Sequence, residues 1–110
     1  GPLLACGLRM GDGAPVRPLE LSVRRQGFEG RLDSPWGPLA IRSLHGYAGS
    51  GFTSQDANGF EVLRAGEPWM VVETLNAGRV LLDPAADPRQ QAYLAAAATA
   101  LLLLDADLGD

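Results

Sequence analysis

The sequence contains no lysine, and its 110 residues include only one cysteine and one histidine. A single cysteine excludes a disulfide within the chain, and one cysteine with one histidine is too few for a Cys/His zinc site. The absence of lysine also excludes a nucleotide-binding P-loop, because that motif needs a lysine next to its glycines. We therefore expect the protein to hold neither a metal nor a cofactor.

Positive charge is also scarce. Nine arginines stand against 13 acidic residues, which gives a net charge of −4. The first 82 residues hold eight arginines and eight acids, so residues 83–110 carry the whole imbalance. A nucleic-acid-binding protein usually carries a basic stripe, and we therefore expect no nucleic-acid partner.

The N-terminal residues 1–16 are interpreted as a tail in front of a single domain at 17–110. Gly1-Pro2 has the form of a scar left by tag removal. Leu3-Leu4-Ala5-Cys6-Gly7 is similar to the lipidation site of a bacterial lipoprotein, in which Cys6 would be a membrane anchor. That alternative requires a signal segment upstream, and we favour a half-buried cysteine in an apolar strand. A free thiol fits a reducing compartment, so the expected location is the cytoplasm.

Short apolar runs with the period of β-strands dominate the sequence from Leu19 onward. In residues 19–24, Leu and Val alternate with Glu, Ser and Arg, as in a half-buried strand. Proline, glycine and asparagine form turn signals between the runs, including the hairpin signal Asn58-Gly59. About seven strands are expected, at 19–24, 28–32, 39–44, 52–54, 60–64, 69–75 and 79–82. Their rhythm predicts a small antiparallel β-barrel or sandwich.

The end of the sequence predicts a helix at about 88–107. Asp87-Pro88-Arg89-Gln90 places an N-cap residue, a first-turn proline and a glutamine in the spacing of a capping box. Residues 92–104 are uncharged and consist mainly of alanine and leucine, which favour helix. Thirteen residues rise only about 20 Å, so we expect no transmembrane span. Because the run is apolar all round, we expect the strands or a second subunit to cover every side.

These elements define an all-β domain with one C-terminal hydrophobic helix, in which about seven strands pack around or on the helix. The pattern resembles the tubby C-terminal-like superfamily, which includes LURP-one-related proteins and phospholipid scramblases. The similarity lies in the hairpin at residues 56–63, with its aspartate and glycine, and in the strand, acidic turn and apolar helix of residues 81–108. It implies a β-barrel around a hydrophobic helix. The family's barrel has about twelve strands, and its lipid site is a basic pocket that has no counterpart among these residues.

Catalytic constellations are weak in this sequence. Ser50, His45 and Asp56 supply the residue types of a hydrolase triad, but Gly49-Ser50-Gly51 lacks the frame of a nucleophile elbow. We expect His45 to be a structural loop histidine and the protein not to be an enzyme.

Two sets of acidic residues leave further alternatives. Asp83, Asp87, Asp105 and Asp107 do not have the spacing of an EF-hand, so we interpret them as solvated helix ends. An unrecognised carboxylate site that uses Glu61, Glu67 or Glu73 is the third functional alternative.

The function expected is a non-enzymatic binding module for a lipid, an apolar small molecule or a protein partner. Trp36 lies in a Pro-Trp-Gly turn and is the best candidate for an exposed recognition anchor. Arg42, His45 and Tyr47 complete the predicted ligand- or partner-binding set, and no residue is expected to bind a metal. The alternative function is a structural subunit that forms a homodimer through its helix and strand edges.

Overall fold

The computed structural model describes residues 4–24, 27–44, 59–73 and 79–108. Within them the chain forms seven strands followed by one helix, in this order: β1 (Leu4–Leu8), β2 (Arg17–Arg24), β3 (Gly27–Leu32), β4 (Leu39–Leu44), β5 (Gly59–Arg64), β6 (Glu67–Glu73), β7 (Arg79–Leu82) and α1 (Pro88–Leu108).

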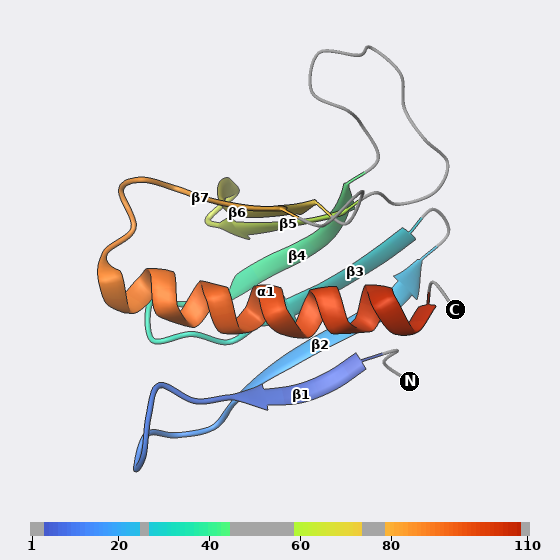
Figure 1. The fold of residues 1–110 in the computed structure, drawn as a ribbon. Helices are drawn as coiled ribbons and strands as arrows, with labels where there is room; N and C mark the ends of the chain where they lie inside the picture. Colours follow the sequence, from blue (N-terminus) through green and yellow to red (C-terminus); the bar gives the residue numbers. More distant parts are fainter. Residues whose placement is uncertain (1–3, 25–26, 45–58, 74–78, 109–110) are drawn as a thin grey trace.

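The strands form one antiparallel sheet in which every strand pairs with its neighbour in sequence, in the order β1-β2-β3-β4-β5-β6-β7. The sheet curls into a half-barrel, and α1 lies across its concave side (Figure 1). This arrangement confirms the predicted fold class, an antiparallel β domain packed on a C-terminal helix. None of the described helical residues forms a stretch long and apolar enough to cross a membrane.

The first strand corrects the predicted domain boundary. Among the residues that the structure describes, Leu4–Leu8 forms β1 and pairs antiparallel with β2 from Leu4↔Leu21 to Leu8↔Arg17, so this part of the predicted tail belongs to the sheet. Cys6 is half-buried in this strand and packs against the core, as favoured from the sequence. The expected strand at 52–54 lies outside the described residues.

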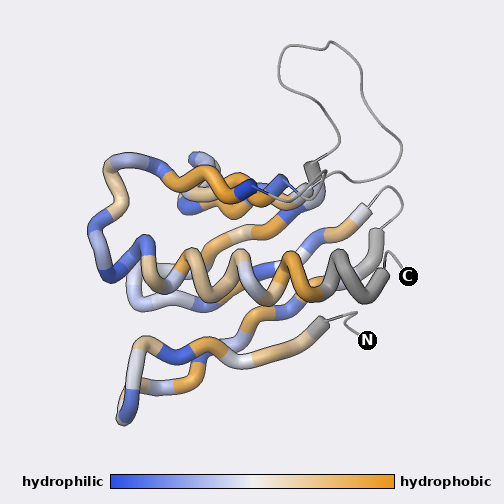
Figure 2. The backbone as a smooth tube through the Cα atoms, in the orientation of Figure 1, coloured by the Kyte–Doolittle hydropathy of each residue, from blue (hydrophilic) through white to orange (hydrophobic). Residues whose placement is uncertain are grey.

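One hydrophobic core fills the space between the sheet and α1. Alternate residues of the strands point toward the helix, so the buried set follows the period-2 pattern of a one-sided sheet. Figure 2 shows the hydrophobic residues along the middle strands and α1, and hydrophilic residues in the connection that leads into the helix. The core consists of Leu19, Leu21, Leu32, Leu39, Ile41, Phe60, Val62, Trp69, Met70, Val72, Tyr93, Leu94, Ala97, Ala98 and Leu101.

The curl of the sheet has local causes in β3 and β5. A Cβ atom at Gly30 would collide with the main-chain carbonyl of Glu20, so only glycine permits this close approach of β2 and β3. In β5 the register with β6 shifts between Val62 and Leu63, which is a β-bulge. Bulges bend a strand and increase its twist. Both features help the sheet to wrap around the helix.

The helix begins as the sequence predicts. The Gln90 amide nitrogen donates to Oδ1 of Asp87 at 2.8 Å, and the Asp87 amide donates to Oε1 of Gln90 at 2.9 Å. This reciprocal pair is the predicted capping box, with Pro88 at the first helical position.

The expectation that every side of α1 would be covered is wrong for the single chain. Tyr93, Leu94, Ala97, Ala98 and Leu101 face the sheet and are buried. The opposite face is exposed and holds Ala92, Ala95, Ala96, Thr99 and Leu103. The half-barrel covers only one side, and a small alanine methyl loses little free energy when it stays in water. An uncharged alanine-rich run therefore does not require complete burial.

Candidate functional site

A cleft lies between the start of α1 and the connection from β1 to β2. Its volume is about 440 Å³, and we call it the helix-start cleft. It is lined by Arg9, Met10, Gly11, Pro88, Arg89, Ala92, Tyr93 and Ala96. This volume falls within the range of roughly 300–1,000 Å³ that is usual for small-molecule sites.

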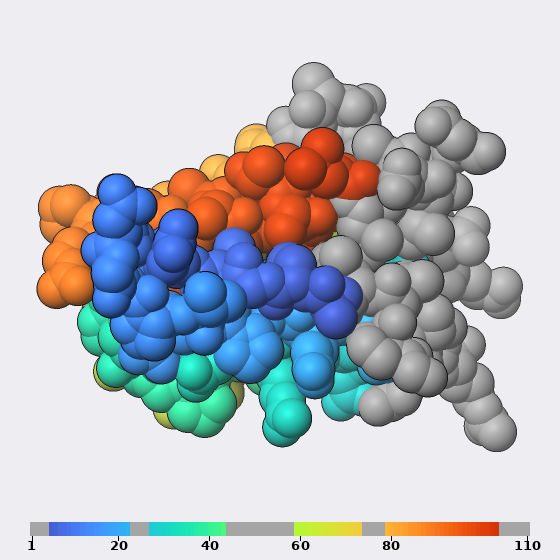
Figure 3. Space-filling view, turned by 90° about the horizontal axis from the view of Figure 1, so that it is seen from below, coloured from blue at the N-terminus to red at the C-terminus, as the bar shows by residue number. Residues whose placement is uncertain are grey.

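Both walls of the helix-start cleft are positioned by local structure. In one wall, Gly11 and Gly13 have positive φ angles, and the Ala14 amide donates to the Gly11 carbonyl at 3.3 Å, which turns the chain back toward β2. In the other wall, the capping box sets where α1 begins. Figure 3 shows the N-terminal segment in blue lying directly against α1 in orange. Residues far apart in the sequence therefore form one surface.

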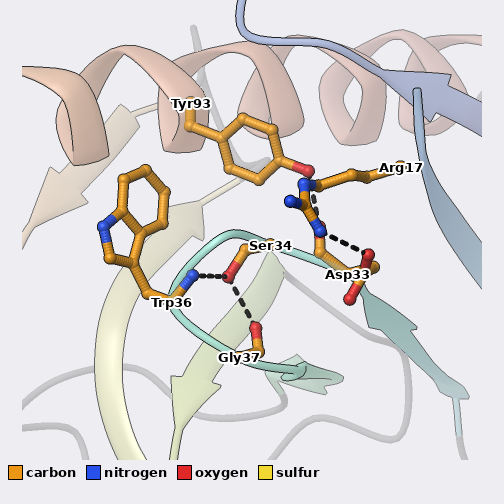
Figure 4. Close-up of polar contacts among 6 residues, drawn as sticks. All are labelled: Arg17, Asp33, Ser34, Trp36, Gly37 and Tyr93. Carbon is orange, nitrogen blue, oxygen red and sulfur yellow. Dashed lines mark hydrogen bonds and ion pairs between the residues drawn. The ribbon is translucent and has the colours of Figure 1, made fainter. Parts of the chain in front are cut away.

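Tyr93 connects the helix-start cleft to the core. Its ring is buried, and its hydroxyl donates a hydrogen bond to the main-chain carbonyl of Asp33 (Figure 4). Beside it, Nη1 of Arg17 forms an ion pair with Oδ2 of Asp33 at 2.9 Å. Burial raises the pKa of Tyr93 above its ordinary value, although the positive charge of Arg17 acts in the opposite direction. The phenol is therefore neutral at physiological pH.

An aromatic cluster supports Tyr93 from the far side. The Trp36 ring packs edge-on against Tyr93 at 5.9 Å and against Trp69 at 6.1 Å between ring centroids. The turn that carries Trp36 is held by Ser34, which is buried and whose Oγ accepts from the Trp36 amide at 3.2 Å (Figure 4). On the outside, the Arg64 guanidinium lies 4.7 Å from the centre of the Trp69 ring. The cluster holds Tyr93 in place.

Seven arginines of the described chain fall into three groups by their contacts. Four form ion pairs with acids: Arg17 with Asp33, Arg31 with Glu20, Arg42 with Glu61, and Arg79 with Glu73. Arg64 lies over Trp69. Arg9 and Arg89 both line the helix-start cleft, and among the residues that the structure describes neither has an acidic partner. The cleft thus combines an apolar wall with two unneutralised cations.

A second hollow, of about 550 Å³, lies beside β3, β4 and β5, and Arg42 is part of its lining. Each of its charged residues has a partner. Nε of Arg42 donates to Glu61 at 3.0 Å, Arg31 lies 3.9 Å from Glu20, and Glu29 also has a partner. Although this hollow is larger, it offers no free charge to a ligand, and we regard the helix-start cleft as the better candidate.

The structure does not bring the four predicted binding residues together in one described site. Trp36 is half-buried in the aromatic cluster, and Arg42 is on the sheet with its charge paired to Glu61. His45 and Tyr47 lie outside the described residues, as do Ser50 and Asp56 of the triad alternative. The role of all four in binding stays a prediction.

The candidate carboxylates and metal ligands do not form a reactive cluster in the described part of the chain. Glu61 is paired with Arg42. Glu73 accepts two hydrogen bonds from Arg79. These hydrogen bonds, more than the charge of Glu73, raise the pKa of the Arg79 guanidinium. Glu67 is exposed at the start of β6. Within the described ranges, no group of three or more His, Cys, Asp or Glu side chains could hold a metal ion.

The residues of the helix-start cleft were missed by sequence reasoning because Arg89 follows Arg9 by 80 positions in the sequence. The sequence contained one signal that pointed to this cleft. Arg89 stands in the first turn of a helix, where the macrodipole disfavours a cation, and that turn holds no acid.

The chain matches no protein-family model, and neither the curated proteins nor the solved structures contain a match to it. The resemblance to the tubby C-terminal-like superfamily therefore stays a prediction.

Proposed function

We propose that the protein is a non-enzymatic binding module that takes an apolar small molecule or a single lipid into the helix-start cleft. The observation that carries this proposal is the pairing of an apolar wall with two arginines that have no acidic partner among the residues that the structure describes. Met10, Ala92 and Ala96 offer contact area to a hydrocarbon group, and the buried Tyr93 ring closes the floor. Apolar walls with a few placed polar groups are typical of ligand sites.

The chemistry of the lining supports binding over catalysis. The titratable side chains around the helix-start cleft are Arg9, Arg89 and Tyr93. An arginine cannot act as a general base, because it remains protonated in proteins. The Tyr93 hydroxyl donates its hydrogen bond to the Asp33 carbonyl, and a phenol whose pKa lies above the ordinary value of 10.0 is not ionised at neutral pH. A carboxylate enzyme built on the glutamates of the sheet remains the less favoured alternative.

A fluorescence titration with the neutral probe N-phenyl-1-naphthylamine tests this proposal. The probe should give a saturable rise in emission with the wild-type protein. Ala96→Phe places a ring in the helix-start cleft and should weaken the probe's affinity at least about 10-fold. Ala95→Phe is the matched control, because Ala95 is exposed on the same helix but does not line the cleft. The absence of saturable binding, or an equal response of both variants, would refute the proposal.

A homodimer formed through strand edges is the second candidate. β1 and β7 are the two ends of the sheet, and Val80 and Leu81 of β7 are 37% and 46% exposed. Exposed apolar residues on an edge strand favour pairing with another chain. Light scattering tests it, since Leu81→Lys should convert a dimer to a monomer. A wild-type monomer at 100 μM would argue against assembly.

A further inference from the structure

The charge distribution at the helix-start cleft is opposite to that of the whole protein. The chain has a net charge of −4, yet the charged side chains that line this cleft are both arginines. The β3–β4 side of the sheet shows the usual arrangement, because Arg31 and Arg42 each lie next to a glutamate there. Two like charges at one cleft without counter-ions raise the free energy of the empty site, and an anion would lower it.

The start of α1 strengthens this local preference for an anion. The peptide dipoles of a helix produce a partial positive charge at its first turn. Arg89 adds a full positive charge in that turn, which contains no acidic residue. The Asp87 carboxylate precedes the turn, but it accepts the Gln90 amide in the capping box and stands outside the lining of the cleft. The lining of the cleft therefore combines two guanidinium groups with the positive end of the helix dipole.

The geometry points to a specific ligand class, which rests on the function proposed above. We infer that the helix-start cleft binds a single amphiphile with one anionic head group, such as a medium-chain carboxylate. The head group lies between the guanidinium groups of Arg9 and Arg89, whose forked donors match a carboxylate. The hydrocarbon part lies along Met10, Ala92 and Ala96, over the Tyr93 ring.

The occupant is one dissolved molecule and not a membrane surface. Recognition of an anionic bilayer usually takes a cluster of about four to eight basic residues, and this cleft offers two. A protein with a net charge of −4 would also be repelled by an anionic bilayer. The volume of about 440 Å³ is suited to one small molecule.

Isothermal titration calorimetry with two ten-carbon probes, decanoate and 1-decanol, tests the inference. Both carry the same hydrocarbon chain, and only decanoate is charged. Decanoate should bind more tightly than decanol by about 10-fold or more, the usual effect of charge-assisted hydrogen bonds. Arg9→Gln and Arg89→Gln should each remove most of that difference and leave the affinity for decanol unchanged.

Arg31→Gln is the matched control. It removes the same formal charge from a side chain that is 80% exposed and does not line the helix-start cleft, so decanoate affinity should stay near the wild-type value. Equal affinity of the two probes, or equal losses in all three arginine variants, would overturn the anionic preference and leave the proposed cleft intact. Failure of both probes to bind would overturn the cleft itself. Binding to vesicles of anionic phospholipid, without binding of free decanoate, would show that a membrane surface is the partner.

Discussion

The two faces of α1 differ in what they contribute. The face toward the sheet has Leu94, Ala97 and Leu101 fully buried, and it closes the core of the half-barrel. The opposite face is also largely apolar, yet Ala95 and Leu103 are exposed there. Hydropathy alone does not distinguish the two faces, because alanine and leucine occur on both. The difference arises from the curl of the sheet, which determines where side chains find partners.

Substituting a leucine on each face gives the largest expected contrast. Leu94→Ala removes a fully buried side chain and leaves a cavity, so it should lower the free energy of unfolding by about 2–5 kcal/mol. Leu103→Ala changes a side chain that is 66% exposed and should cost less than about 0.5 kcal/mol. Urea unfolding followed by tryptophan fluorescence measures both. Similar losses for the two variants would show that the outer face is also covered, as in an oligomer.

Enlarging an alanine on each face probes the same contrast from the opposite direction. Ala97 has no exposed surface, so Ala97→Leu should overpack the core and cost about 1–3 kcal/mol. Ala95→Leu points into solvent and should leave the stability within about 0.5 kcal/mol of wild type. Thermal unfolding monitored by circular dichroism distinguishes them. A stabilising effect of Ala97→Leu would indicate that the inner face is loosely packed.

The hydroxyl of Tyr93 makes the inner face sensitive to alkaline pH. Burial raises its pKa in the folded protein from the ordinary value of 10.0, so the neutral phenol favours folding. This contribution is complete below the unfolded pKa and is lost as the pH rises through the folded pKa. Tyr93→Phe should cost about 1 kcal/mol at pH 7, because it leaves the Asp33 carbonyl without this donor.

The same variant should show a smaller loss of stability than wild type between pH 9 and pH 11. The chain has no lysine, so no lysine ammonium group titrates in this range, and every other ionisable side chain is the same in the two proteins. Urea unfolding at several pH values measures it. Parallel pH profiles for the two proteins would contradict a raised pKa at Tyr93.

Removal of the capping box, at the start of α1, is expected to have the smallest effect on stability. Asp87→Ala removes the carboxylate that accepts the Gln90 amide and should cost about 1 kcal/mol. Asp12→Ala is the control, because Asp12 is exposed in the β1–β2 connection. Hydrogen exchange at the first turn of α1 should accelerate in the first variant only. Unchanged exchange would mean that packing alone holds the helix start.

Local sequence signals predicted the elements whose causes are local. The capping box at 87–90 and the alternation in 19–24 depend on neighbours within a few residues, and both are present in the structure. The sequence predicts an apolar strand around Cys6 but assigns it to a tail, because the pairing of Leu4–Leu8 with β2 depends on the fold and leaves no local signal. The one-sided burial of α1 also depends on an arrangement distant in sequence, namely how far the sheet curls.

The candidate site could not be predicted for the same reason. Arg9 and Arg89 have no local pattern in common, and only the packing of α1 beside β1 places them around one cleft. Arg42 was proposed from the sequence as a binding residue, but the sequence does not reveal that the register of β4 and β5 sets it opposite Glu61. Pairing across strands thus decides which arginines remain free.

The most direct test of the account is an amide chemical-shift map of the wild-type protein titrated with decanoate. We predict saturable shifts at residues 9–11 and 89–96, on the two walls of the helix-start cleft, with residues 39–42 unchanged. Arg9→Gln with Arg89→Gln in one chain should move those shifts to decanoate concentrations about 10-fold or more higher, while the rest of the spectrum keeps its folded dispersion. Shifts concentrated at 39–42 or 63–66, with the cleft amides unmoved, would place the ligand on the sheet and contradict the account.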